Sequence, residues 1–222
     1  MTQPDGPERT LALLAKAPTA SPVALMLRHA EREEITPGAF GNDVPLTRDG
    51  SESARRLGMG LSSRMMGVVK SSPLPRCTQT ADAIIAGAGW KANATPDRLL
   101  GDPGPFVVEP ELAGRLFLDI GIEEIVRRQL ADDQPPSGMR STSSGARLVL
   151  RELAAALNGP SSIGVFVTHD AVLAALVGHL YRLPVQDFPW PDYLDALVVW
   201  PASDRLRFLW RGLGEGAHPV GG

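Results

Sequence analysis

Arginine and histidine side chains stand shortly after several short apolar runs of the sequence. They are Arg28, His29 and Arg32 after the run at 23–27, Arg76 after the run at 66–70, and His169 after the run at 163–167. Ligands of open α/β sheets bind at the carboxyl ends of the strands. If these runs are adjacent parallel strands, one crevice gathers three guanidinium and two imidazole groups. A tetrahedral phosphate suits such a cluster, because its oxygens accept several charge-assisted hydrogen bonds at once.

Each of these residues also has an ordinary explanation when it is taken alone. An Arg-His pair after an apolar run arises often by chance, Arg76 suits a surface ion pair, and His169 suits a helix start. Their coincidence at successive strand ends favours the joint interpretation. The sequence therefore predicts an anion site, and Arg28, Arg32, Arg76 and His169 are its predicted substrate-binding residues.

Composition and charge exclude several other classes of function. The chain has 222 residues, is 43% hydrophobic and carries a net charge of −3, with a pI near 5.8. A chain so close to neutral is not held to nucleic acid or to an anionic membrane by bulk charge. The N-terminus shows no secretory pattern, and no apolar run approaches the length of a membrane span. We therefore expect a cytoplasmic protein with neither a nucleic-acid nor a membrane partner.

Cysteine and motif content argue against metals and cofactors. Cys77 is the single cysteine, so neither an intrachain disulfide nor a multi-cysteine zinc site can form. Cationic side chains around the predicted anion site would repel a metal ion. The chain lacks the P-loop, the nucleophile-elbow and the H-E-x-x-H motifs, and Ala83 stands where a cysteine phosphatase would need an arginine. We expect no metal and no cofactor, with Cys77 as a buried structural residue.

Hydrophobic periodicity predicts an α/β/α sandwich whose central sheet is mixed and mainly parallel. Strands are expected at 23–27, 66–70, 163–167, 196–200 and 206–210, and helices at 8–17, 47–62, 76–86, 122–130, 144–157 and 171–181. Gly87 is expected to end the third helix, and residues 98–121 to be irregular. We expect a single domain over 1–222, with a leader and short helix at 1–21 and a flexible tail at 212–222.

Four motifs together resemble the histidine phosphatase superfamily, which is also called phosphoglycerate mutase-like. They are RHAER at 28–32, PLT at 45–47, SSPLPRCTQTA at 71–81 and VTHD at 167–170. The motifs occur in the family's order and spacing over about residues 23–185. The resemblance implies a three-layer fold with a mixed sheet. It also implies that His29 is the nucleophile that accepts a phosphoryl group, and that Arg28, Arg76 and His169 hold the phosphate.

The sequence departs from the family's small members after the second histidine. These members usually have glycine there, whereas this chain has Asp170, which resembles the larger acid phosphatase and phytase branch with its aspartate proton donor. We favour Asp170 as the acid and keep Asp102 as the alternative, with Glu109 and Glu31 as further candidates. A carboxyl group that donates a proton must be protonated, so this assignment predicts a pH optimum at or below neutral.

The resemblance and these residues together imply metal-independent hydrolysis of phosphate monoesters through a phosphohistidine on His29. The alternatives are a phosphoglycerate mutase-type phosphotransferase, a phosphatase of phosphohistidine in proteins, and a non-catalytic phosphate-binding module. The expected partner is a phosphorylated small molecule or a phosphoprotein. Specificity should come from the loops at 33–44, 103–115 and 131–143. Candidate apolar walls there, each also suited to ordinary core packing, are Phe40, Phe106, Phe117 and Met139.

Overall fold

The computed structural model describes residues 5–131, 135–183 and 190–219 of the chain. In chain order the elements are α1 (Gly6–Leu14), β1 (Val23–Arg28), α2 (Arg48–Leu61), β2 (Met66–Ser71), α3 (Pro75–Ala88), β3 (Thr95–Pro96), the 3₁₀ turn η1 (Arg98–Leu100), α4 (Pro110–Ile120), α5 (Ile122–Ala131), α6 (Thr142–Ala156), β4 (Ile163–Thr168), α7 (Asp170–Tyr181), β5 (Ala196–Ala202), β6 (Arg205–Leu209) and β7 (Gly216–Pro219). Most expected strands and helices are therefore present, with ends shifted by a few residues.

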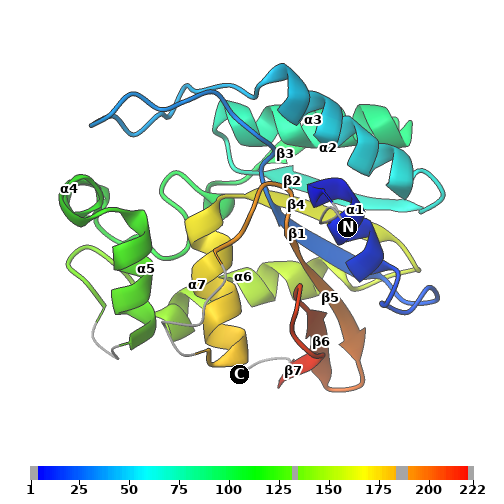
Figure 1. Ribbon diagram of the computed structural model, residues 1–222. Helices are drawn as coiled ribbons and strands as arrows, with labels where there is room; N and C mark the ends of the chain where they lie inside the picture. The colour runs from blue at the N-terminus through cyan, green and yellow to red at the C-terminus, as the bar shows by residue number, and fades with distance from the viewer. Residues whose placement is uncertain (1–4, 132–134, 184–189, 220–222) are drawn as a thin grey trace.

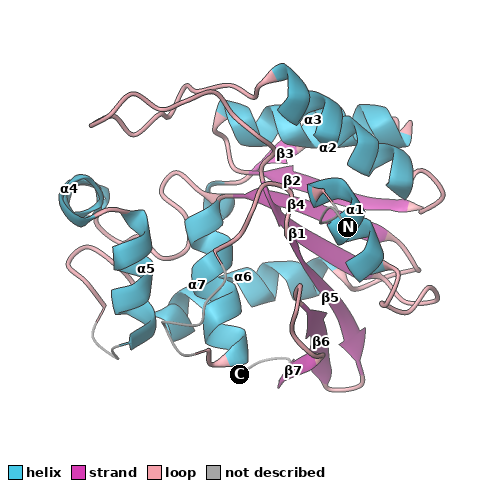
Figure 2. Ribbon diagram, viewed as in Figure 1, coloured by secondary structure: helices cyan, strands magenta, loops and turns pink. Residues whose placement is uncertain are grey.

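The strands form one sheet in the order β3-β2-β4-β1-β5-β6-β7. Strands β3, β2, β4 and β1 pair in parallel, whereas β5, β6 and β7 continue the sheet in antiparallel pairs. The sheet is thus mixed, with parallel pairing among its central strands, as the sequence predicted. Figure 2 shows helices on both sides of this sheet, so the fold is a three-layer α/β/α sandwich.

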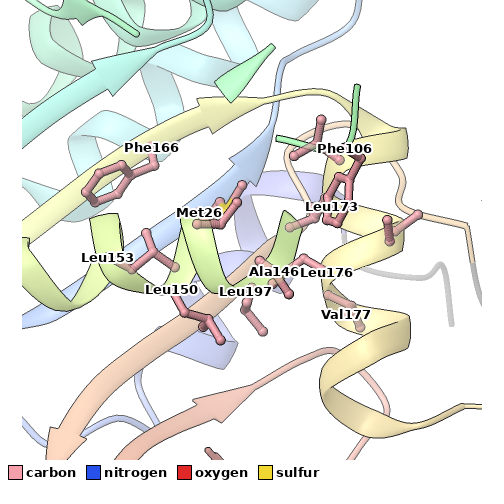
Figure 3. Packing of buried hydrophobic residues seen from close by; sticks show 14 of the residues in the cluster. Met26, Phe106, Ala146, Leu150, Leu153, Phe166, Leu173, Leu176, Val177 and Leu197 are labelled. Atoms are coloured by element: carbon pink, nitrogen blue, oxygen red, sulfur yellow. The ribbon is translucent and has the colours of Figure 1, made fainter. Parts of the chain in front are cut away.

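Alternating side chains of the strands pack into two separate hydrophobic cores, one on each face of the sheet. Along β1, Ala24 and Met26 pack on the side of α6 and α7, and Leu25 and Leu27 pack on the side of α1, α2 and α3. Every one of these four side chains is fully buried, as the period of two along a strand requires. Figure 3 shows the first core, in which Met26 and Phe166 face Leu150 and Leu153 of α6.

Helix α3 corrects the expected helix end at Gly87. The helix continues to Ala88 and is closed by Gly89, whose φ of +68° lies in the left-handed region that glycine tolerates. Gly87 lies inside the helix instead, where a Cβ would collide with the carbonyl oxygen of Arg55 on α2. Gly87 therefore permits the close approach of α2 and α3, which lie together in Figure 1.

Helix α4 corrects the expectation of irregular chain over residues 98–121. Pro110 begins the helix, where its missing N–H costs no hydrogen bond. Ala113 of this helix is fully buried in the core that contains α5 and α7. The density of proline and glycine in the segment concealed a helix that tertiary packing stabilises.

Strand β7 corrects the expected flexible tail at 212–222. Residues 216–219 pair with β6, and the Phe208 side chain occupies the space that a Cβ on Gly216 would need. The expected leader and tail fall partly outside the described residues, at 1–4 and 220–222. In the described part of the chain, no helix is long and apolar enough to cross a bilayer.

Candidate active site

The carboxyl ends of three neighbouring strands meet at one edge of the sheet. Strand β4 lies between β2 and β1 and is parallel to both. Arg28 pairs in register with Thr168, and Ser71 pairs with Val167. The structure therefore confirms the adjacency and direction of strands on which the predicted anion site depended.

His29 follows β1 directly and is only 3% exposed. Its backbone N–H donates to the carbonyl oxygen of Thr168 (2.9 Å), and its Nδ1 lies 2.7 Å from the carbonyl oxygen of Ala30. Because a carbonyl only accepts, Nδ1 carries the hydrogen and Nε2 keeps a lone pair. Burial lowers the pKa of His29 well below its usual value, and His169 and Arg76 lower it further. The side chain is thus a neutral imidazole.

His169 precedes α7 and faces His29. The two ring centroids are 5.5 Å apart, and Nε2 of His169 lies 2.9 Å from Oγ of Ser72. Burial, followed by the charge of Arg76, lowers the pKa of His169 to about 3. A Cβ on Gly101 would collide with the His169 ring, so glycine at 101 lets the backbone approach the site.

Cys77 lies beside His169 but takes no part in the candidate chemistry. Its Sγ is 3.6 Å from Nε2 of His169. The thiol is fully buried, and burial raises its pKa to about 12. The side chain therefore stays a thiol, as expected for a structural cysteine.

Two guanidinium groups lie near the site, that of the buried Arg76 and that of Arg28, whose side chain is 12% exposed. Nη1 of Arg76 donates to the carbonyl oxygen of Gly41 (2.6 Å), and Nη1 of Arg28 donates to that of Pro191 (2.7 Å). The guanidinium of Arg28 lies 4.2 Å from the ring centroid of Tyr193, a cation–π arrangement. Nε of each arginine is buried without a hydrogen-bond partner among the described residues. A buried donor without an acceptor is costly, and an anion would satisfy both.

The predicted acids differ in their surroundings. Asp170 begins α7, where Oδ1 accepts from the N–H of Ala171 (2.8 Å) and Oδ2 lies 3.0 Å from Nη2 of Arg28. Asp102 has a side chain 41% exposed, with Oδ2 3.7 Å from Nη2 of Arg98. Glu31 instead accepts from the hydroxyl of Thr47, the residue that caps α2.

One cavity of about 520 Å³ joins most of the candidate residues. Its lining includes His29, Arg32, Arg76, Asp102, His169 and Asp170. Arg28 is absent from the described lining, but it forms an ion pair with Asp170, which does line the cavity. Glu31 and Glu109 are likewise absent from it. All four expected apolar walls, Phe40, Phe106, Phe117 and Met139, do line it, whereas residues 132–134 of the third predicted loop lie outside the described residues.

Sequence reasoning missed several groups that hold the site together. Ser72 was visible in its motif, but its contact with His169 was not. The carbonyl of Gly41 and the ring of Tyr193 gave no signal, because they meet the arginines only through tertiary contact. Within the described residues, His, Cys, Asp and Glu form no group of three or more able to hold a metal ion.

Comparison with known families and structures agrees with the motifs. Residues 24–100 match the family model of the histidine phosphatase superfamily (branch 1). This match confirms the family resemblance that the sequence motifs indicated. No curated protein matches the chain.

Solved structures share the fold at low sequence identity. YhfR of Bacillus stearothermophilus is 17% identical over 86% of this chain and 97% of its own, with a TM-score of 0.61. A mycobacterial glucosyl-3-phosphoglycerate phosphatase complexed with VO3 is 23% identical over 87% of this chain and 100% of its own, with a TM-score of 0.58. A phosphoglycerate mutase from Bacillus anthracis str. Sterne is 16% identical over 91% and 95%, with a TM-score of 0.57.

Proposed function

We propose that this chain, whose residues 24–100 match the family model of the histidine phosphatase superfamily, hydrolyses phosphate monoesters through a phosphohistidine on His29. The observation that carries the proposal is the state of His29. Its Nδ1–H is held by the Ala30 carbonyl, its burial keeps the ring neutral, and it lines a cavity together with Arg76. Nε2 is then a lone-pair nucleophile beside a group that attracts phosphate.

The guanidinium groups would stabilise the transferred phosphoryl group. The unpaired Nε donor of Arg76 suits one of its oxygens, and Arg32 at the same cavity suits the outer side. Arg28 stays a proposed phosphate ligand that lies beside the cavity, in contact with Asp170. Donors fixed in advance in a buried site stabilise charge that develops in the transition state. His169, held by Ser72, would donate from its other ring nitrogen to a phosphate oxygen.

The reaction would proceed in two steps. Nε2 of His29 attacks phosphorus, the ester P–O bond breaks, and an acid protonates the departing alkoxide. Water then attacks the phosphohistidine, the P–N bond breaks, and the same carboxylate accepts the proton of that water. Asp170 is the proposed acid, because it adjoins both Arg28 and His169, and Asp102 is the alternative.

Hydrolysis is favoured over a mutase reaction by the charges of the cavity. A mutase must hold a second anionic group of its substrate. Among the described lining residues, the guanidinium groups are Arg32 and Arg76, and both are needed for one phosphate. Arg115, the basic residue of α4, is exposed and is not part of this lining.

The test measures phosphate release from p-nitrophenyl phosphate, with and without EDTA. We expect turnover that EDTA leaves unchanged and that His29→Ala reduces by at least about 10³-fold. Circular dichroism checks that the variant is folded. Phosphate binding without turnover would instead identify a binding module, and a requirement for added Mg²⁺ would contradict metal-independent chemistry.

A further inference from the structure

The cavity extends beyond the His29 end into a region walled by apolar side chains. These come from the loop before α2, from the segment before α4, and from α4 and α5. We call them the outer pocket: Phe40, Val107, Phe117, Leu118 and Ile122. In Figure 1, α4 and α5 lie at the side of the molecule away from β5, β6 and β7.

The loop before α2 reaches across to α4 over this region. A Cβ on Gly114 would lie 3.1 Å from Cζ of Phe40, closer than ordinary packing allows. The lack of a side chain at Gly114 therefore lets the Phe40 ring rest against the helix. Two segments far apart in sequence thus enclose the outer pocket.

The outer pocket leaves large apolar surface open to solvent. Phe40 is 48% exposed and Leu118 is 50% exposed. Exposed apolar side chains gathered at a cavity are typical of ligand sites, because an apolar ligand removes them from water. The cavity volume of about 520 Å³ lies within the roughly 300–1,000 Å³ of small-molecule sites and far exceeds the needs of a phosphate group.

Charged groups are scarce beyond the phosphate end. The described lining contains two guanidinium groups, Arg32 and Arg76, and two carboxylates, Asp102 and Asp170. A phosphate dianion engages both arginines and leaves no cation for another anionic group. Asn42 and Gln129 are uncharged polar side chains of the same lining. Nε2 of Gln129 donates to the carbonyl oxygen of Arg140, so this donor is occupied within the protein.

We infer that the substrate is a phosphate monoester whose ester group is an apolar chain or ring of several carbons with no second anionic group. The inference rests on the proposed phosphatase function and specifies its substrate class. The phosphate would lie against Arg76 and the two histidines, and the apolar group would cover the outer pocket.

The test uses a series of n-alkyl phosphates: ethyl, butyl, hexyl and octyl phosphate. Their alcohols differ little as leaving groups, so differences in kcat/KM report binding of the chain. We expect kcat/KM to rise about three- to four-fold for each methylene that the pocket buries. We also expect 3-phosphoglycerate, which carries a second anion, to be a poorer substrate than butyl phosphate.

A pair of variants localises the effect. In the double variant Phe40→Ser/Leu118→Ser, the ratio of kcat/KM between octyl and ethyl phosphate should fall towards one. Both side chains are about half exposed, so the fold should tolerate their loss. Val108→Ser is the matched control, because Val108 lies just before α4 and is 52% exposed, about as much as Phe40 and Leu118, but does not line the cavity. It should keep the wild-type ratio.

The outcomes separate the two proposals. Equal kcat/KM for all chain lengths, or a preference for 3-phosphoglycerate, overturns the inferred substrate class and leaves a phosphatase that depends on His29. Absence of turnover with every ester overturns the proposed function. Calorimetry with the alkyl phosphates then decides the substrate class: tighter binding of octyl than of ethyl phosphate supports the outer pocket, and equal binding refutes it.

Discussion

The two ends of the cavity are built in opposite ways. The phosphate end consists of buried polar side chains at strand ends and at the helix starts that follow them, where His29 is 3% and Arg76 is 7% exposed. The outer pocket consists of apolar side chains on helices and a loop, where Phe40 and Leu118 are about half exposed. Central strands and the first turns of the helices that follow them hold the groups that must be placed accurately for chemistry. Peripheral helices and loops hold groups whose identity selects the substrate.

Replacing the proposed proton donor, Asp170, should have the largest effect at the phosphate end. Asp170→Asn should lower kcat/KM for ethyl phosphate by about 10²- to 10⁴-fold. The loss should be much smaller for p-nitrophenyl phosphate, because nitrophenolate departs without a proton. If the variant acted only by losing the contact between Asp170 and Arg28, hydrolysis of both esters would slow equally. Asp102→Asn is the comparison variant. If Asp102→Asn, rather than Asp170→Asn, lowers kcat/KM much more for ethyl phosphate than for p-nitrophenyl phosphate, Asp102 is the proton donor.

Arg76→Lys should reduce kcat/KM by about 10²- to 10³-fold for every ester. An ammonium group cannot supply both the hydrogen bond to the Gly41 carbonyl and the buried Nε donor. Arg55→Lys, on the exposed side of α2, is the control and should leave the rate unchanged. A loss confined to long alkyl esters would contradict the separation of the cavity into two ends.

The buried histidines should make the stability of the phosphate end depend on pH. Burial lowers the pKa of His169 from 6.5 to about 3, so the unfolded chain binds more protons than the folded chain between these values. The free energy of unfolding is thus largest above about pH 6.5 and falls as the pH drops towards 3. Urea denaturation across this range measures the fall, which His169→Gln should reduce. His218→Gln, on β7, should leave it unaltered, and an equal fall in both variants would refute the assignment.

The smallest effect is expected where the outer pocket meets solvent. Leu118→Ala should change the free energy of unfolding by no more than about 0.5 kcal/mol, because the side chain is half exposed. Leu153→Ala, fully buried beneath the sheet, should cost about 2–5 kcal/mol. Thermal denaturation of both compares them. A large loss at Leu118 would show that the outer pocket supports the fold as well as binding.

The sequence by itself determined the features that depend on local pattern. Alternation and apolar runs located β1, β2 and β4. The predicted arginines and histidines lie at the ends of these strands or, like Arg76 in the first turn of α3, a few residues beyond them. Thr47 was recognised as the cap of α2, since a capping side chain bonds within its own turn. The predicted anion site required these strands to be adjacent and parallel, and the order of the strands came from the structure.

Only the tertiary structure decided the contacts between distant segments. Tyr193 lies against Arg28, Ser72 against His169, and Phe40 against α4, in each case across a sequence separation of more than 70 residues. Helix α4 was hidden by its own proline and glycine, because burial of Ala113 rather than local propensity stabilises it. Spacing reveals which side chains leave a strand end, but the partners they meet depend on how the layers pack.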